Sequence, residues 1–378
     1  MEKAYKYRLY PNKTQQQILE KHFGATRWIY NYGLEKKIKA YQKDKSNLSC
    51  FQISNELPKL KSNKETEWLK EVNSQSLQMA LRQLDNAYTK FFKKQASFPN
   101  FKKKHKKKSF SIPQGNKINF DKGIATFIKV GSLKAVFDRA FVGRIIRATI
   151  SKNCVGQYFV SYTVDEKFEI IKPKKIKDKT TIGIDLGLKS FAVLSDGRTI
   201  DNPKHLNKNE KRLAILQRRL SRKQKGSQNR KKAKIKVAKL YNKISNQRSY
   251  FLHNFTHQLT HDNQVETYAI ENLNVKGMMK NHCLAKAIGD VSWGEFIRQL
   301  TYKSKWYGKN LLVIGRFEPS SKMCSCGYVN KDLTLADRKW TCPKCQTTHD
   351  RDLLAAQNIK KFALSPLLKR VVPVELSQ

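Results

Sequence analysis

Three acidic residues stand in otherwise apolar segments of the chain. Asp185 follows Thr181-Ile182-Gly183-Ile184, Glu271 ends Thr267-Tyr268-Ala269-Ile270-Glu271, and Asp352 precedes Leu353-Leu354-Ala355-Ala356. Burying a carboxylate in such a segment is costly unless a cation compensates. Two Mg²⁺ ions about 4 Å apart would do so and would stabilise the attacking and leaving oxygens of a phosphodiester. Alternatively, each acid caps a turn or pairs with one of the 76 basic residues, and spacing alone leaves both interpretations open.

Four of the seven cysteines form a cluster near the C-terminus. Cys324 and Cys326 form one pair, Cys342 and Cys345 the other, and 15 residues separate the pairs. Four thiolates in two short knuckles suit a closed, structural, tetrahedral Zn²⁺ site. Four unrelated buried thiols are the alternative. An odd total with one tight group indicates reduced thiols and a metal site, not a disulfide framework.

Other polar residues could contact nucleic acid. A run of lysines that includes Lys102, Lys103, Lys104 and Lys106 lies among Phe98, Phe101 and Phe110. This pattern predicts a strip that follows phosphates and offers stacking platforms, with a solvated loop as the alternative. Gln75 and Gln78 could contact adenine edges, although a plain polar surface is the preferred interpretation.

Three histidines share one helical face. The spacing is four residues for His253, His257 and His261, which could suggest a row of metal ligands along the helix. No acidic residue lies between them, so a satisfied or solvent-facing surface is favoured.

The elements that must position these residues begin with a strand over residues 1–10, where apolar and polar residues alternate. Thr14 and Gln17 fit a capping box at the start of a helix, which Gly24 should separate from a second helix. From Asn73, apolar residues spaced three and four apart predict an amphipathic helix.

Residues 109–164 contain short β-rich pieces separated by glycines. They predict an antiparallel barrel or sandwich that the N-terminal strand completes and that carries an inserted helical region. Beyond residue 180, a strand, a tight turn and a return strand precede a basic helical hairpin over 204–262. Two further apolar strands and a helix over about 350–368 follow. The predicted fold is therefore an α+β multidomain one.

The charge balance narrows the classes of function. The chain has 378 residues and a formal net charge of +46, which excludes most ordinary metabolic enzymes and indicates a polyanionic partner such as nucleic acid. No stretch is long and apolar enough for a membrane span, and the N-terminal residues do not resemble a signal peptide. A cytoplasmic, prokaryotic location is expected, with nucleoid association when DNA is bound.

The ordered set of motifs resembles the TnpB family, which comprises RNA-guided nucleases encoded by insertion sequences and related to type V CRISPR effectors. The residues that carry the resemblance are Tyr5-Lys6-Tyr7-Arg8-Leu9-Tyr10-Pro11-Asn12, Pro99-Asn100-Phe101-Lys102, Gly183-Ile184-Asp185-Leu186-Gly187, Ala269-Ile270-Glu271-Asn272-Leu273, Asp337-Arg338-Lys339-Trp340-Thr341-Cys342 and His349-Asp350-Arg351-Asp352.

The resemblance implies an RuvC-like nuclease domain with the ribonuclease H fold, in which Asp185, Glu271 and Asp352 bind Mg²⁺ and the cysteines form a zinc module. It also implies a guide RNA copied from the transposon end and a double-stranded DNA target cut beside a short flanking motif. Two positions depart from the family pattern. Only Ser325 separates the first two cysteines, and Leu354 stands where asparagine is expected.

The resulting domain prediction divides the chain into six parts. They are a wedge-like barrel (1–11 and 99–172), a helical recognition insertion (12–98), a linker (173–179), a first nuclease part (180–319), a zinc module (320–348), and a second nuclease part with the tail (349–378).

Two other functions remain open at this stage. Leu354 is the one residue that favours a nuclease-dead, RNA-guided repressor, whereas the three retained acids favour an active nuclease. A sugar-kinase-like or actin-like ATPase also begins with a strand, a turn and an acid. The basic charge and the cysteine cluster would have no role in such an ATPase.

Overall fold

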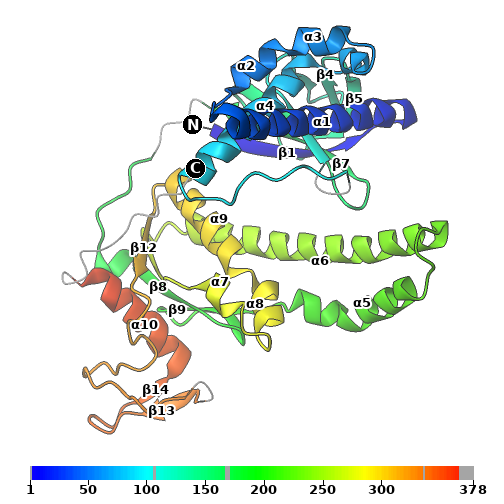
Figure 1. Cartoon of the computed structure of the whole chain (residues 1–378). Coiled ribbons are helices and arrows are strands. Elements are labelled where there is room, and N and C mark those ends of the chain that lie inside the picture. The colour runs from blue at the N-terminus through cyan, green and yellow to red at the C-terminus, as the bar shows by residue number, and fades with distance from the viewer. Residues whose placement is uncertain (1, 105–107, 167–170, 335–336, 366–378) are drawn as a thin grey trace. The chain divides into compact units, whose positions relative to one another are not determined.

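The chain falls into two units, residues 1–169 and 170–378. The computed structural model describes residues 2–104, 108–166, 171–334 and 337–365 (Figure 1). The finer six-part division stays a prediction. Part of the predicted tail, residues 366–378, and Lys106 of the basic run lie outside the described residues.

The first unit consists of a sheet and a group of helices. Its elements are β1 (Glu2–Tyr10), α1 (Lys13–Asp44), α2 (Cys50–Asn55), α3 (Leu57–Ser62), a 3₁₀ turn (Glu67–Glu71), α4 (Ser74–Phe92), β2 (Lys108–Ile112), β3 (Lys117–Asn119), β4 (Ile124–Phe127), β5 (Gly131–Val136), β6 (Arg144–Lys152) and β7 (Tyr158–Asp165).

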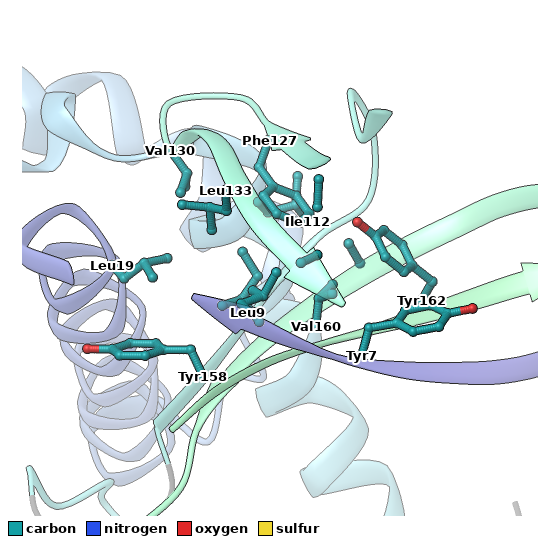
Figure 2. Close-up of a cluster of buried hydrophobic side chains, with 14 of the residues drawn as sticks. Tyr7, Leu9, Leu19, Ile112, Phe127, Val130, Leu133, Tyr158, Val160 and Tyr162 are labelled. Atoms are coloured by element: carbon teal, nitrogen blue, oxygen red, sulfur yellow. The ribbon is translucent and has the colours of Figure 1, made fainter. Parts of the chain in front are cut away.

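The sheet of the first unit is antiparallel, as predicted, and the N-terminal strand lies at its centre. The strand order is β2-β6-β7-β1-β5-β4-β3. The predicted barrel is wrong, because β2 and β3 are edges of the described sheet and do not pair with each other. Helix α1 covers the apolar face instead: Figure 2 shows Leu19 extending from α1 toward Leu9 and Leu133, with which it shares a buried cluster.

Helix α1 differs from the prediction in where it begins and in its continuation through Gly24. Helix α1 begins after Asn12, whose side chain accepts a hydrogen bond from the Gln15 backbone while the Gln15 side chain accepts one from the Asn12 backbone, both at 2.9 Å. The Thr14 start was therefore two residues late. The helix also continues through Gly24, because buried residues anchor it before this unfavourable glycine, as Leu19 does, and after it, as Ile29 does. The predicted helix after Asn73 is confirmed as α4.

The second unit contains a sheet between helical layers. Its elements are a 3₁₀ turn (Asp178–Thr180), β8 (Thr181–Leu186), β9 (Ser190–Leu194), β10 (Thr199–Asp201), α5 (His205–Ser221), α6 (Gln228–His261), β11 (Thr267–Glu271), α7 (Val275–Met278), α8 (Ala285–Val291), α9 (Trp293–Trp306), β12 (Asn310–Ile314), β13 (Lys339–Thr341), β14 (Thr348–Asp350) and α10 (Arg351–Leu364).

This five-stranded sheet is mixed, with the order β10-β9-β8-β11-β12. Strands β8, β11 and β12 are parallel, and β9 and β10 are antiparallel to their neighbours. Helices α6 and α9 bury one face through Phe255 and Phe296, and α10 buries the other through Ile359. Burial on both faces explains why β8 and β11 are almost continuously apolar.

The basic hairpin is confirmed as α5 and α6, which pack against each other along a buried stripe (Figure 1). Leu213, Val237, Leu240 and Ile244 form that stripe, and exposed lysines and arginines cover much of the outer surface. Within the described ranges, no helix has both the length and the apolar composition that crossing a membrane requires.

The covering of the first sheet by α1 predicts unequal effects at two adjacent residues of β1. Leu9 is 1% exposed and Tyr10 is 52% exposed. We expect Leu9→Ala to destabilise the unit by about 2–5 kcal/mol because it leaves a cavity under α1, whereas Tyr10→Ala should cost much less. Amide hydrogen exchange of β1 and β7, measured in the full chain at increasing urea concentrations, gives the loss of stability in each variant. Equal losses at both positions would contradict the packing described here.

Candidate metal centres and nucleic-acid contacts

Two of the three predicted acids lie side by side on neighbouring strands. Ile184 of β8 pairs in register with Ile270 of β11, and these strands run parallel, so Asp185 and Glu271 follow at the same level. Ile184 and Ile270 belong to the core beneath α6 and α9. Because side chains alternate along a strand, Asp185 and Glu271 project to the opposite face, which α10 covers.

Gly183 lets helix α10 approach that face closely. A Cβ atom at Gly183 would lie 2.0 Å from the backbone oxygen of Ala356 and 2.7 Å from the backbone nitrogen of Lys360. Gly183 is two residues before Asp185 and therefore on the same face of β8. Asp352 is one helical turn before Ala356, so it extends along the same side of α10 toward the strand ends.

The N-terminus of α10 is fixed by its own cap. The Asp350 carboxylate accepts hydrogen bonds from the backbone nitrogens of Asp352 and Leu353, both at 3.1 Å. Asp350 also ends strand β14, so the helix start that carries Asp352 is attached to the β13–β14 hairpin.

Electrostatics indicate that the three acids are close enough to repel one another. Burial, followed by the charges of Glu271 and Asp352, raises the pKa of Asp185 to about 7 against the opposing effect of Arg351. Burial also raises the pKa of Glu271, although the Ser320 hydroxyl donates a hydrogen bond to its carboxylate. A set of carboxylates with this unmet negative charge suits a hard divalent cation.

The alternative interpretation, in which each acid pairs with a basic residue, applies only to one of the three. Arg338 lies 3.5 Å from the Asp352 carboxylate. Neither Asp185 nor Glu271 forms an ion pair with a lysine or arginine of the described chain. Asp185 and Glu271 therefore have no ion-pair partner among the described residues, although the charge of Arg351 lowers the pKa of Asp185.

Ser320 and Asn358 support this site, and the sequence analysis missed both. The Asn358 amide donates to the backbone oxygens of Ser320 and Met323 at 2.7 and 2.6 Å, and it is 3% exposed. Asn358 thus holds the loop from which Ser320 reaches Glu271. The signal available in the sequence was an asparagine within the largely apolar segment that forms α10.

Leu354 has an apolar role. It is 4% exposed and packs in a cluster with Trp340, Cys324 and Cys342. The side chain that replaces the expected asparagine therefore joins α10 to the cysteine module.

The four predicted cysteines come together. The Sγ atoms of Cys324, Cys326, Cys342 and Cys345 lie within 4.8 Å of one another and could hold one metal ion. The single residue between Cys324 and Cys326 is accommodated by a tight turn, in which the Gly327 backbone donates to Cys324 and the Cys324 backbone donates to Tyr328. His349 Nε2 lies 3.0 Å from Cys324 Sγ and extends the cluster to β14.

The predicted nucleic-acid residues have different surroundings. Lys102 lies against α1: its Nζ atom is 3.8 Å from the centre of the Tyr30 ring, its backbone exchanges two hydrogen bonds with Asn31, and burial lowers its pKa to about 8. Lys102 taken as a whole residue is exposed, as are Lys103 and Lys104. The Gln75 amide donates to Gln114 at 3.0 Å, and Gln78 is exposed on α4.

The histidine face is on the solvent side of α6. His253, His257 and His261 are exposed, and the rings of His257 and His261 are 3.6 Å apart. In the part of the chain that the structure describes, the cysteine cluster is the group of three or more potential ligands spaced to hold one metal ion, and Asp185, Glu271 and Asp352 are not spaced in this way.

Comparisons with known proteins agree with this architecture. Family models match residues 159–282 ("Probable transposase"), 293–359 ("Cas12f1-like, TNB domain") and 1–46 ("Helix-turn-helix domain"). The last of these covers β1 and the single continuous helix α1. The solved structure of Cas12f1 with its guide RNA and target DNA has a similar fold, with a TM-score of 0.58 at 16% identity over 95% of this chain and 98% of that one.

Two relatives are similar over almost their whole length. A Streptomyces pristinaespiralis protein named "Putative RNA-guided DNA endonuclease" is 38% identical over 97% of this chain and 90% of its own. The Escherichia coli protein InsQ, which has the same description, is 31% identical over 94% and 91%. The chain belongs to the TnpB family of insertion-sequence proteins.

The close approach at Gly183 predicts the effect of adding one methyl group. Gly183→Ala should push α10 away from β8, cost about 1–3 kcal/mol, and loosen the helix start that carries Asp352. Hydrogen exchange of residues 351–364 measures this. Gly294→Ala is the matched control, because among the described residues Gly294 has open space at its Cβ position within helix α9. Unchanged exchange in Gly183→Ala would show that α10 does not depend on this contact.

Proposed function

We propose that this protein is an RNA-guided DNA endonuclease of the RuvC type, which binds an RNA from the end of its transposon and cuts DNA beside a short flanking motif. The observation that carries the proposal is the group of Asp185, Glu271 and Asp352 between β8, β11 and α10, with its unmet negative charge. Membership of the TnpB family, whose members named above are described as RNA-guided DNA endonucleases, supports the same function.

In this proposal the three carboxylates would hold two Mg²⁺ ions. Such ions would supply activation of a water molecule and stabilisation of the leaving oxygen of the phosphodiester. Ser320 fixes the orientation of the Glu271 carboxylate by its hydrogen bond, and Asn358 holds Ser320 in place. Asp350 fixes the backbone of Asp352. The residues of the site are thus oriented before substrate binds.

The positive charge supplies the affinity for nucleic acid. A net charge of +46 suits a protein that holds an RNA and an RNA–DNA duplex by their phosphates, while base pairing selects the sequence. The exposed lysines and arginines of α5 and α6 and the exposed Lys103 and Lys104 are candidates for such contacts.

The proposal predicts two effects of Asp185→Asn, which keeps the shape of the side chain and removes its charge. DNA cleavage should fall by more than about a hundredfold, beyond the 10–100-fold typical when only a partner of a metal ligand is lost. RNA binding should be unchanged, and the melting temperature without metal should not fall, because like-charge repulsion is relieved.

Cleavage assays, RNA-binding assays and thermal unfolding with and without Mg²⁺ check this prediction. Wild-type cleavage that Asp185→Asn leaves intact would contradict the assignment of Asp185. A wild-type protein that binds its RNA and target without cutting would instead support the RNA-guided repressor.

We also propose that the cysteine cluster binds one structural Zn²⁺. The four sulfur ligands leave no position for water, and soft thiolates suit Zn²⁺. Leu354 and Asp350 connect this module to α10, so the zinc ion would stabilise the helix that carries Asp352.

Metal analysis of the purified protein should find about one zinc ion per chain, the stoichiometry of a single four-thiolate site. Cys326→Ser should lose most of this zinc and lower the melting temperature, because one ligand is removed. Cys154→Ser is the control, since Cys154 is an exposed cysteine outside the cluster. Equal zinc contents in the two variants would contradict the site.

A further inference from the structure

Gly24 lies in the middle of helix α1, and no contact with the described residues requires a glycine there. Glycine within a helix costs about 1 kcal/mol relative to alanine. Gly33 of the same helix has such a reason, because a Cβ atom there would lie 2.7 Å from Leu81. At Gly24, no atom of the described residues lies within 4 Å of the Cβ position, apart from the helix's own backbone and the neighbouring residues. A glycine on a helix surface, because it has no side chain, allows another molecule to approach the backbone closely.

The open surface at Gly24 is one wall of a hollow of ≈ 340 Å³. We call it the tryptophan pocket. Its lining residues are Lys21, Gly24, Arg27, Trp28, Trp68 and Glu71. The residues from α1 recur at intervals of three and four, so they share one face of the helix.

The aromatic rings of the tryptophan pocket have fixed orientations. Trp28 stacks on Tyr32, with ring centres 5.3 Å apart and an angle of 14° between planes. Trp68 meets Trp28 edge to face at 5.7 Å and 79°. The indole nitrogen of Trp68 donates a hydrogen bond to the backbone oxygen of Glu65 at 3.1 Å, and Trp68 is 37% exposed. The pocket therefore offers flat aromatic surface whose polar group is already satisfied.

The polar residues around the rings differ in their partners. Lys21 and Glu71 form an ion pair across one side of the pocket. Arg27 forms no ion pair with any residue in the described ranges. An unpaired guanidinium beside an aromatic hollow suits a phosphate next to a stacked ring, and the Glu71 carboxylate could accept from an exocyclic amino group.

We propose that the tryptophan pocket binds one unpaired base of the bound RNA, with Arg27 contacting a neighbouring phosphate. This inference rests on the proposed function, because it requires that the protein bind RNA. RNA is favoured as the occupant since proteins recognise RNA mainly through unpaired bases that stack on aromatic side chains, whereas the bases of duplex DNA remain paired. The missing side chain of Gly24 leaves room for the base edge against the helix.

The test is a substitution that fills the pocket without disturbing the fold. Gly24→Leu introduces a good helix former into open space, so the melting temperature should rise or stay the same. Affinity for the RNA that co-purifies with the protein should fall by about 5- to 150-fold, the range that stacking of one base contributes. Trp68→Leu should act in the same direction on affinity. Gly294→Leu is the matched control and should leave affinity unchanged.

Chemical probing of the RNA in the complex identifies the base. One unpaired nucleotide should be protected by the wild type and by Gly294→Leu, and exposed by Gly24→Leu and Trp68→Leu. Wild-type affinity and an unchanged probing pattern in both pocket variants would overturn this inference and leave the proposed function intact. A protected base found only in the DNA strand would overturn the assignment to RNA. A wild type that binds no discrete RNA would overturn the proposed function, and this inference with it.

Discussion

The site depends on the contact between the backbone of α10 and Gly183 of β8. No side chain other than hydrogen fits there, since a Cβ atom would lie 2.0 Å from the Ala356 oxygen. This close approach places the first turn of α10 next to the ends of β8 and β11, where Asp185 and Glu271 project on the same face. Three carboxylates from segments far apart in the sequence thus share one negative region, and burial together with the charges of Glu271 and Asp352 raises the pKa of Asp185 to about 7.

A second group of residues holds this arrangement in place. Asn358 fixes the loop of Ser320, and Ser320 bonds to Glu271, so α10 contributes to the orientation of an acid on another strand. Leu354 packs against the cysteine module, which ends in the strand that caps α10. Loss of order in the cysteine module should therefore affect the acids, even though the thiols are not part of their site.

The sequence predicted features that depend on local pattern and missed those that depend on tertiary contact. Periodicity predicted helix α4, and apolar runs predicted the strands that carry Asp185 and Glu271. Spacing along the chain predicted that the four thiols come together. The predicted closure of the first sheet into a barrel was wrong. Alternating apolar residues show that one face of a sheet is buried, but they do not show whether a helix covers that face, as α1 does through Leu19. Ser320 and Asn358 gave no periodic signal, because their role depends on hydrogen bonds between distant segments.

The central claim is that base pairing of a bound RNA directs the Asp185–Glu271–Asp352 site to a chosen DNA. Replacing only the terminal guide segment of the co-purified RNA, and mapping the cuts in a plasmid with two possible targets, tests it most directly. The account predicts that the Mg²⁺-dependent cut moves to the target that matches the new segment and is absent in Asp185→Asn. A cut that stays at the same position, or occurs without RNA, would contradict the account.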